Sequence, residues 1–376
     1  MVGKKNKKIF IGMEKVIIHL HYLMRYIMEQ NNLFDMKLYS NEIVFRGHPD
    51  KVCDQISGAI LNACLKQDNH SRVGVECVGG KGKIFVTGEI TTNAKIDVDE
   101  IVKKVLENVG YNKHCEIINN IGQQSNDIAL GVDIGGAGDN GMMFGYACNE
   151  TEQYLPKAMV ILQEFAKEYD ILRQKDKRFL SDGKAQITGI YNKSFKLNTI
   201  KTFTICYQNT ELERTETDKI IINIAKNIAK NYGVVIQQFL INPTGRFLIG
   251  GFDGDAGLTG RKIVVDAYQS FANVGGGCMN GKDPSKVDIS GAYKARQIAL
   301  EYLKEFNLNW CEVQLSYAIG KKEPLAIYID SNIGNLIPKD KLWFECIPGN
   351  IIKELKMLEL DYEKQAQFGH FSKGGN

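Results

Sequence analysis

Pairs of short strand-like segments, separated by segments of helical pattern, constrain the fold of this chain more than any other feature. Residues 73–78 and 84–90 alternate apolar and polar side chains on either side of a glycine-rich turn at 79–82. The run that precedes them, 50–67, places its apolar residues at helical spacing. Because adjacent strand pairs alternate with separate helices, without a regular strand–helix–strand winding, the pattern predicts an α+β fold.

The same mixture continues towards the C-terminus. Asp97 begins a predicted helix that ends at Gly110, since an aspartate before the first turn and a glycine after the last are typical helix ends. Further helices are expected at 155–169, 217–231 and 290–306, and further strands at 185–191, 201–207, 239–241, 312–318 and 325–330. A chain of 376 residues with this alternation is expected to form two or three domains.

Composition narrows the class of protein. Hydrophobic residues make up 44% of the chain and charged residues 24%, which is ordinary for a globular protein. The formal net charge of +3 is small for this length, so neither a nucleic acid nor a membrane surface is expected as a partner. The nine cysteines are scattered and form no CxxC pair, which argues against a zinc site or a disulfide framework and favours a cytoplasmic location.

The N-terminal segment differs from the rest of the chain. Residues 9–28 are rich in apolar side chains, but Glu14, Lys15 and Arg25 interrupt them, which disfavours a membrane-spanning helix or a secretory signal. We expect residues 1–35 to be an upstream extension, with Met36 as the natural start. An amphipathic docking helix is the alternative interpretation.

Four short segments place acidic and basic residues beside glycine, at 47–51, 135–141, 254–262 and 281–288. Glycine lets backbone N–H groups approach a phosphate, lysine and arginine neutralise it, and aspartate oxygens bind Mg²⁺. Each segment alone fits a solvated charged turn, and a lone histidine such as His48 is more often structural than catalytic. Together, the four segments predict a site for a polyphosphate and its metal ions.

Two of these segments also approximate known nucleotide-binding motifs. Gly136, Gly138 and Gly141 have the spacing of a dinucleotide-binding loop, but the Met-Met-Phe-Gly-Tyr run that follows is not a typical helix start. Gly281-Lys282 resembles the end of a P-loop, yet Asp283 stands where a serine or threonine should bind Mg²⁺, and no hydrophobic strand precedes it. A P-loop phosphotransferase is therefore an alternative that leaves the other three segments unexplained.

From about Ser40 to Phe371 the chain resembles the methionine adenosyltransferase (S-adenosylmethionine synthetase) family. The matching runs include, in order, GHPDK, TGEITT, GAGDNGMMFGYA, INPTGRF, GDAGLTGRKIVVD, GKDPSKVD, SYAIG and FGHF. The resemblance implies three similar α+β domains of mixed or antiparallel sheet with helices, in a pseudo-threefold arrangement. We expect their segments to be 36–134, 135–247 and 248–376. It also implies a homodimer or homotetramer with active sites at the dimer interface.

The resemblance implies a reaction as well. The chain would join ATP to L-methionine, form S-adenosylmethionine and release phosphate and pyrophosphate, using two Mg²⁺ ions per site and one K⁺ per subunit. A thioether sulfur is already a neutral nucleophile, so its in-line attack on the ribose C5′ needs no general base. Positioning and fixed positive charge should therefore supply most of the acceleration. A non-catalytic regulatory relative is a further alternative, although it predicts losses at key positions that this chain retains.

Candidate site residues follow from the resemblance by position. Those matched to catalysis are His48, Lys184, Arg261 and Lys282. Those matched to ATP and its phosphates are His48, Lys51, Asp182, Lys184, Arg246, Phe247, Asp255, Arg261, Lys262, Cys278 and Lys282. Those matched to methionine are Glu89, Gln124, Asp139, Asp255 and Lys286. Those matched to metal are Asp50 and Asp288 for Mg²⁺, and Glu76 for K⁺.

The chain departs from the family pattern at several positions near these motifs. Arg46 stands where a glutamate is usual, which predicts a reversed charge beside the site. Asn140 replaces a usual glutamine, and Ile289 a usual arginine. Cys278 begins Cys-Met-Asn where Ala-Phe-Ser is common, and the 132–136 segment is shorter than the lid of many relatives. No change removes a predicted metal or phosphate residue, so these departures bear on gating and substrate tolerance.

Overall fold

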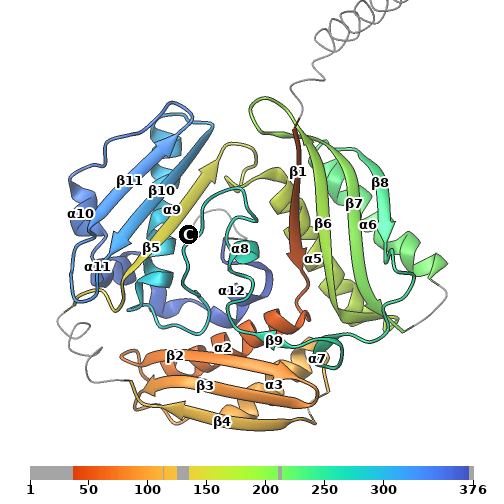
Figure 1. The fold of residues 1–376 in the computed structure, drawn as a ribbon, viewed down its shortest axis with the longest axis horizontal. Helices are drawn as coiled ribbons and strands as arrows, with labels where there is room; N and C mark the ends of the chain where they lie inside the picture. Colours follow the sequence, from red (N-terminus) through yellow and green to blue (C-terminus); the bar gives the residue numbers. More distant parts are fainter. Residues whose placement is uncertain (1–36, 113, 125–134, 211–213, 372–376) are drawn as a thin grey trace, which may run out of the picture.

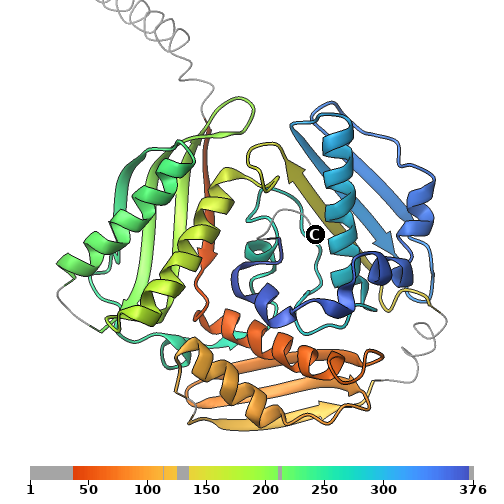
Figure 2. The ribbon, with the colours of Figure 1, turned by 180° about the vertical axis from the view of Figure 1, so that it is seen from behind.

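Three β-sheets surround a common centre in the computed structural model, which describes residues 37–112, 114–124, 135–210 and 214–371 (Figure 1). Each sheet is covered by helices on one face, and Figure 2 shows these helices from behind. The predicted α+β fold of three units is confirmed. The expected extension at 1–35 and most of the expected short lid lie outside the described residues.

The first sheet contains the hairpin that the sequence predicts. Strand β2 (Arg72–Gly80) pairs antiparallel with β3 (Lys83–Thr91), while β4 (Glu116–Gly122) runs parallel to β3. Helices α2 (Pro49–Leu65) and α3 (Val98–Val109) lie close to 50–67 and 97–109, where they were predicted. The Asp97 side chain accepts a hydrogen bond from the Glu100 amide, and Gly110 ends α3 with a positive φ of 87°, as expected for these caps.

The second sheet has the order β1-β6-β7-β8. Its strands are β1 (Lys37–Val44), β6 (Phe179–Tyr191), β7 (Leu197–Asn209) and β8 (Ile236–Ile241). Its helices are α5 (Lys157–Lys175) and α6 (Thr215–Asn231). Buried aromatic side chains lie among aliphatic ones in its core, with the Phe165 and Phe203 rings 5.3 Å apart.

The third sheet has the order β11-β10-β5. Its strands are β5 (Gly141–Cys148), β10 (Trp310–Tyr317) and β11 (Ala326–Ser331), and helix α9 (Val287–Glu305) packs on β5 and β10. Short elements complete the chain: α7 (Gly251–Gly254), β9 (Gly257–Leu258), α8 (Ile263–Asp266), α10 (Lys341–Glu345), α11 (Pro348–Glu354), η2 (Met357–Glu359) and α12 (Tyr362–Phe368).

The sheets exchange strands along the chain. Strand β1 precedes the first sheet but pairs with β6 of the second, and β5 precedes the second sheet's hairpin but pairs with β10 of the third. Strand β9, which lies late in the sequence, pairs with β2 of the first sheet. Each sheet therefore contains strands from two of the predicted domain segments. The domain boundaries after residues 134 and 247 remain a prediction.

Candidate active site

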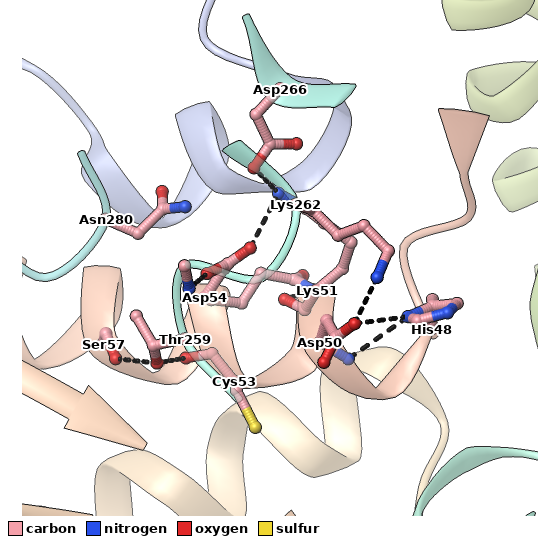
Figure 3. A network of polar contacts seen from close by, with 12 residues as sticks. His48, Asp50, Lys51, Cys53, Asp54, Ser57, Thr259, Lys262, Asp266 and Asn280 are labelled. Carbon is pink, nitrogen blue, oxygen red and sulfur yellow. Dashed lines mark hydrogen bonds and ion pairs between the residues drawn. The ribbon is translucent and has the colours of Figure 1, made fainter. Parts of the chain in front are cut away.

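The N-terminus of α2 carries the first pair of candidate site residues. His48 precedes the helix with extended backbone, and its Nδ1 accepts a hydrogen bond from the Asp50 amide at 3.2 Å. Pro49 occupies the first helical position. An N–H at that position has no partner within the helix, so proline loses nothing there, and its restricted φ favours the helix. The sequence His-Pro-Asp therefore fixes two candidate site side chains at one helix end (Figure 3).

Asp50 ties this helix end to the loop after β9. Its Oδ1 accepts a hydrogen bond from the Leu258 amide at 3.0 Å and lies 3.6 Å from Nη1 of Arg261, while its Oδ2 pairs with Nζ of Lys262. Burial by itself would raise the pKa of Asp50, but the hydrogen bonds from Lys262 and Leu258 outweigh it and lower the pKa below its usual value. Asp50 is therefore a carboxylate at neutral pH.

His48 is neutral at physiological pH. Burial first, and then the positive charges of Lys262 and Lys184, lower its pKa to about 4, although Asp50 and Asp255 act in the opposite direction. Because Nδ1 accepts a hydrogen bond from a backbone amide, the proton of the neutral ring belongs on Nε2. His48 can thus donate one hydrogen bond through Nε2 and is poorly suited to act as a cation.

A second acid–base pair lies at the start of α9. Nζ of Lys282 pairs with Oδ2 of Asp288, in the first turn of that helix. A Cβ placed on Gly277 would lie 2.0 Å from Asp288 Oδ1, so only glycine lets this loop pass the carboxylate. A Cβ on Gly141 would lie 3.7 Å from the same oxygen. The segments at 135–141 and 281–288 therefore meet at Asp288.

One further contact joins the two pairs. A Cβ on Gly260 would lie 2.9 Å from Cβ and Sγ of Cys278, which places the 254–262 loop against the 275–281 loop. Burial raises the pKa of Cys278 to about 12, so its thiol is protonated. The four glycine-containing segments that the sequence singled out thus form a continuous chain of contacts within one protomer.

Two candidate methionine-binding residues lie together beside this region. Nζ of Lys286 is 2.9 Å from Oδ2 of Asp283 and 4.0 Å from Oε1 of Glu89. Gly74 lies between them, since its Cβ would be 3.3 Å from Cε of Lys286 and 3.4 Å from Cγ of Glu89. An ammonium and a carboxylate at this spacing could recognise the two ends of an amino acid.

The remaining methionine candidates lie at loop positions. The Gln124 amide donates to Oγ1 of Thr91 at 3.2 Å, which places the residue near the end of β3. Asp139 is exposed, and its Oδ1 accepts a hydrogen bond from the amide of its neighbour Asn140. Among the described residues, neither side chain forms a hydrogen bond or ion pair with Glu89 or Lys286.

The central-domain candidates border the loop at 246–255. Oδ2 of Asp182 accepts a hydrogen bond from the Gly251 amide at 2.7 Å, and burial raises the pKa of this carboxyl to about 6. Lys184, Arg246 and Asp255 are exposed, and Phe247 is half-buried. Lys184 and Asp255 act electrostatically on both Asp182 and His48, so they lie within range of the same space.

Lys51 is buried between two carboxylates and does not lie at the surface, where a phosphate could reach it. Its side chain is 1% exposed, with Nζ 3.1 Å from Oδ2 of Asp54 and 2.6 Å from Oδ2 of Asp266 (Figure 3). Asp54 in turn accepts a hydrogen bond from the Gly260 amide. Lys51 therefore supports the loop that carries Arg261 and Lys262 from beneath.

The three predicted metal ligands do not form a cluster. Across the described part of the chain, no group of three or more His, Cys, Asp or Glu side chains converges to hold a metal ion. Asp50 and Asp288 are each paired with a lysine, and Glu76 is exposed on β2. As carboxylates, Asp50 and Asp288 still offer the oxygen donors that Mg²⁺ prefers.

The Arg46 side chain contacts residues outside the candidate site, contrary to the expectation from its position. Its Nε donates to Oε1 of Gln55 at 2.9 Å, and its Nη1 lies 3.5 Å from Oδ2 of Asp170 on α5. The Gln55 amide donates back to the Arg46 carbonyl at 2.8 Å. The substitution thus links the turn before α2 to the second sheet's helix layer and does not reverse a charge in the site.

The two alternative nucleotide motifs do not have their required surroundings. Gly141 begins strand β5 rather than a helix, so the dinucleotide-loop interpretation fails. Lys282 forms an isolated bridge with Gly74, and α9 begins only at Val287. A P-loop needs a helix directly after its lysine, so that interpretation fails as well.

Several supporting residues were not predicted from the sequence. Three are buried carboxylates: Asp54 and Asp266 pair with Lys51, and Asp283 pairs with Lys286. The Thr259 hydroxyl accepts a hydrogen bond from the Cys77 amide and shares another with the Ser57 hydroxyl. Asp54 and Asp266 lie in apolar surroundings in the sequence. An acidic residue at such a position is the signal that could have identified them.

Comparison with known proteins agrees with this arrangement. The N-terminal, central and C-terminal domain models of S-adenosylmethionine synthetase match residues 36–126, 134–247 and 249–375. The S-adenosylmethionine synthase of Fusobacterium nucleatum is 40% identical over 355 residues, covering 89% of this chain and 93% of the relative. That of Clostridium tetani is 39% identical over 371 residues, covering 90% and 94%.

A third relative matches over a similar share of its length. The S-adenosylmethionine synthase of Mycoplasmopsis synoviae is 39% identical over 355 residues, covering 90% of this chain and 92% of the relative. Within the described ranges, no helix has the length and apolar character needed to cross a bilayer. Since three consecutive domain models and full-length relatives match the chain that carries these paired charges, it belongs to the S-adenosylmethionine synthetase family, a family of methionine adenosyltransferases.

Proposed function

We propose that this chain forms S-adenosylmethionine by in-line attack of the L-methionine sulfur on the ribose C5′ of ATP, with release of phosphate and pyrophosphate. The observation that carries the proposal is the pairing of Asp50 with Lys262 and of Asp288 with Lys282 where four glycine-containing loops meet. A magnesium–triphosphate group would separate both pairs, because its metal ions can bind the carboxylates and its phosphates can bind the lysines. Carboxylates then face metal and lysines face phosphate, so no charge is left unpaired.

Mg²⁺ suits the donors that these pairs offer. Asp50 and Asp288 supply hard carboxylate oxygens, and two Mg²⁺ ions per site agree with two carboxylates on separate elements. When bound, Mg²⁺ neutralises the developing charge of a leaving polyphosphate. Lys184, Arg261, Lys262 and Lys282 would add fixed positive charge around the same phosphate chain.

His48 would act as a neutral hydrogen-bond donor in this reaction. With a pKa of about 4 and Nδ1 occupied by a backbone amide, its Nε2–H is free to donate to the oxygen that leaves C5′. Because the thioether sulfur attacks without losing a proton, no side chain must remove one. The rate acceleration would therefore come from alignment of the reacting atoms and from stabilisation of the leaving group's charge.

Methionine would bind beside Gly74. Lys286 can pair with the substrate carboxylate, and Glu89 can pair with the ammonium group, because the two side chains lie 4.0 Å apart with opposite charge. Gln124, Asp139 and Asp255 are our further candidates for this substrate. Asp182, Arg246, Phe247 and Cys278 are our further candidates for ATP.

A homodimer or homotetramer is the assembly we propose, with active sites at the dimer interface. Val78, Phe85 and Ile118 are direct neighbours in register across β2, β3 and β4, and they are 42%, 36% and 40% exposed. An apolar row across a sheet face favours association. Glu76 lies two residues before Val78 on the same face, so a partner would also enclose our candidate K⁺ carboxylate, one per subunit.

We propose a cytoplasmic location. The described cysteines form no disulfide, and burial raises the pKa of eight of them, with values of about 12 for Cys148 and Cys311. Buried, unpaired thiols are typical of proteins in a reducing compartment.

The reaction is tested with purified protein, ATP, L-methionine, Mg²⁺ and K⁺. We expect S-adenosylmethionine by mass spectrometry, with equimolar phosphate and pyrophosphate, and none when Mg²⁺ is removed by EDTA. An Asp288→Asn variant should lose at least about a hundredfold in kcat, since it removes a metal-binding charge. If ATP binds but no product forms under any cation condition, the chain is a regulatory relative and our proposal is wrong.

A further inference from the structure

A cavity of about 300 Å³ lies away from the candidate active site, where the β6–β7 hairpin approaches the end of β5 and the start of β10 (Figure 1). Its lining comes from the chain segments 146–150, 194–196 and 309–312, together with Pro156, Phe271 and Asp330. None of the candidate catalytic, ATP, methionine or metal residues lines it. Its volume is suitable for a small ligand.

Aromatic rings form much of this cavity's wall, from Tyr146, Phe195, Phe271 and Trp310. Phe195 stacks on Tyr191 at 4.9 Å and meets the Phe271 ring at 5.8 Å, so its position is fixed before any ligand binds. Phe195 also has a positive φ of 57°, which is unfavourable for a bulky residue. A strained residue held in place at a cavity is a common feature of binding sites.

The charge in the lining is predominantly negative. Glu150 accepts hydrogen bonds from the Lys157 and Leu197 amides, and Glu312 accepts from the amide and side chain of Asn273. Asp330 accepts from the Ser331 amide.

All of these donors are neutral, and within the described ranges none of the three carboxylates forms an ion pair with a lysine, arginine or histidine. Lys196 is the basic residue of the lining, so the lining residues carry a net negative charge, and Nζ of Lys37 lies 5.9 Å from the centroid of the Phe195 ring.

We propose that this cavity binds a small organic cation of the alkylammonium or sulfonium class. The faces of aromatic rings attract cations, and the effect grows when the cation is removed from water. The carboxylates supply the opposite charge that the cation needs on leaving solvent. A hydrated metal ion would gain nothing from the rings, and a neutral apolar molecule would gain nothing from the carboxylates. An organic cation uses both.

The test uses Trp310 as a reporter in the wall of the cavity. The chain has two tryptophans, so a Trp343→Phe variant leaves Trp310 as the single one. Its fluorescence is followed during titration with tetramethylammonium chloride and, separately, trimethylsulfonium chloride. Ionic strength is held constant with NaCl, and tert-butanol serves as the neutral probe of similar shape. We expect a saturable change with a Kd of about millimolar for the two cations and none for the alcohol.

Matched variants then separate charge recognition from simple packing. Glu312→Gln combined with Asp330→Asn keeps the size of each side chain and one acceptor oxygen on each, but removes two charges, and should weaken cation binding by roughly tenfold. Glu323→Gln, at the far turn of the same β10–β11 hairpin, should leave it unchanged. Thermal melting of each variant verifies the fold.

Three results would overturn the proposal: no saturable response up to about 100 mM cation, an equal response to tert-butanol, or unchanged cation affinity in the doubly neutralised variant. Because binding is read by fluorescence without substrates, these results are independent of the proposed catalytic activity.

Discussion

At the residue scale, the candidate site is a set of charges that hold one another in place. Asp50 holds Lys262, and Asp288 holds Lys282. Each pair is partly buried, so removing one member leaves the other without a partner in a poorly solvated position, which is costly. A ligand that brings both signs of charge can replace both partners at once. His48, whose pKa is lowered to about 4 mainly by burial, lies beside the first of these pairs.

The surroundings of Gly277 and Gly276 predict that an alanine substitution affects activity at the first position and not at the second. A Cβ at this position would meet Oδ1 of Asp288 at 2.0 Å, whereas a Cβ on Gly276 has no atom within 4 Å. We expect Gly277→Ala to displace the carboxylate and lower kcat/KM by at least about tenfold, with Gly276→Ala close to wild type. Steady-state kinetics of both variants, with circular dichroism for the fold, provides the measurement. Equal activities would refute the close approach.

His370 predicts how stability depends on pH. Burial, followed by the charge of Lys51, lowers its pKa to about 3 from an ordinary 6.5, and its Nδ1 lies 3.1 Å from the Tyr293 hydroxyl. Between these values the unfolded chain binds a proton that the folded chain does not, so this residue makes stability fall as pH falls.

At pH 5, a His370→Gln variant should show a slope of unfolding free energy against pH that is smaller by about 1.4 kcal/mol per pH unit. Denaturant unfolding at several pH values measures the slope. A variant slope equal to that of wild type would show that the folded histidine is already protonated there.

At the scale of elements, loops between sheets bring the candidate site residues together, and the N-terminal ends of helices α2 and α9 carry Asp50 and Asp288. Arg46 adds a contact between such elements, because it joins the turn before α2 to Asp170 of α5. Burial raises the pKa of Glu363 on α12, and the charge of Arg46 acts against this rise, so a second carboxyl lies within range.

Arg46→Glu would introduce the residue that the resemblance leads us to expect at this position, yet we expect it to destabilise this chain by about 1–3 kcal/mol. The new carboxylate would face Asp170, whose remaining ion partner is Arg173, and Glu363, and would add a third negative charge to this group. Asp170→Asn in the Arg46→Glu background should recover part of the loss, and Arg46→Gln should cost less than Arg46→Glu. Chemical denaturation measures all four proteins. Stability of Arg46→Glu equal to wild type would disprove the proposed contact.

Sequence patterns identified the long elements of the fold and missed the strands whose pattern is weak. The hairpin β2–β3 and helices α2, α3 and α9 alternate or repeat clearly, and all were predicted. Strand β4 carries Asn119 and Asn120 in its middle, and β5 follows a glycine-rich loop, so neither has a strong strand signal.

The candidate site was predicted in part for a similar reason. Resemblance of motifs identified the paired charges, while contacts between distant segments depend on how the sheets exchange strands. Lys51 illustrates this limit, because the partners that bury it lie 3 and 215 positions away. Local sequence cannot tell such a lysine from one that faces a phosphate.

At the scale of the whole molecule, the exchanged strands β1, β5 and β9 connect the three sheets into one body. Each crosses from one segment of the chain to a sheet built mainly from another. The apolar row Val78, Phe85 and Ile118 remains exposed on the first sheet. This exposed apolar face of the first sheet supports the proposed dimer, because a partner subunit would bury it.

Charged residues in the apolar row should separate the subunits. We expect Phe85→Glu combined with Ile118→Glu to be monomeric by light scattering and to lose most product formation, because the proposed sites lie at the interface. Ile337→Glu, at a side chain that is 89% exposed and outside the row, is the control and should assemble as wild type does. A fully active monomer would contradict the shared-site arrangement.

The central claim is that two carboxylate–lysine pairs open to receive a metal–polyphosphate group, and calorimetric titration with inorganic tripolyphosphate tests it most directly. With Mg²⁺, we predict that Asp50→Asn and Asp288→Asn bind at least about tenfold more weakly than wild type, because metal-binding oxygens are lost. Without Mg²⁺, the same variants should bind more tightly, because a negative charge is gone and a lysine is released. Changes of the same sign under both conditions, or none, would contradict the account.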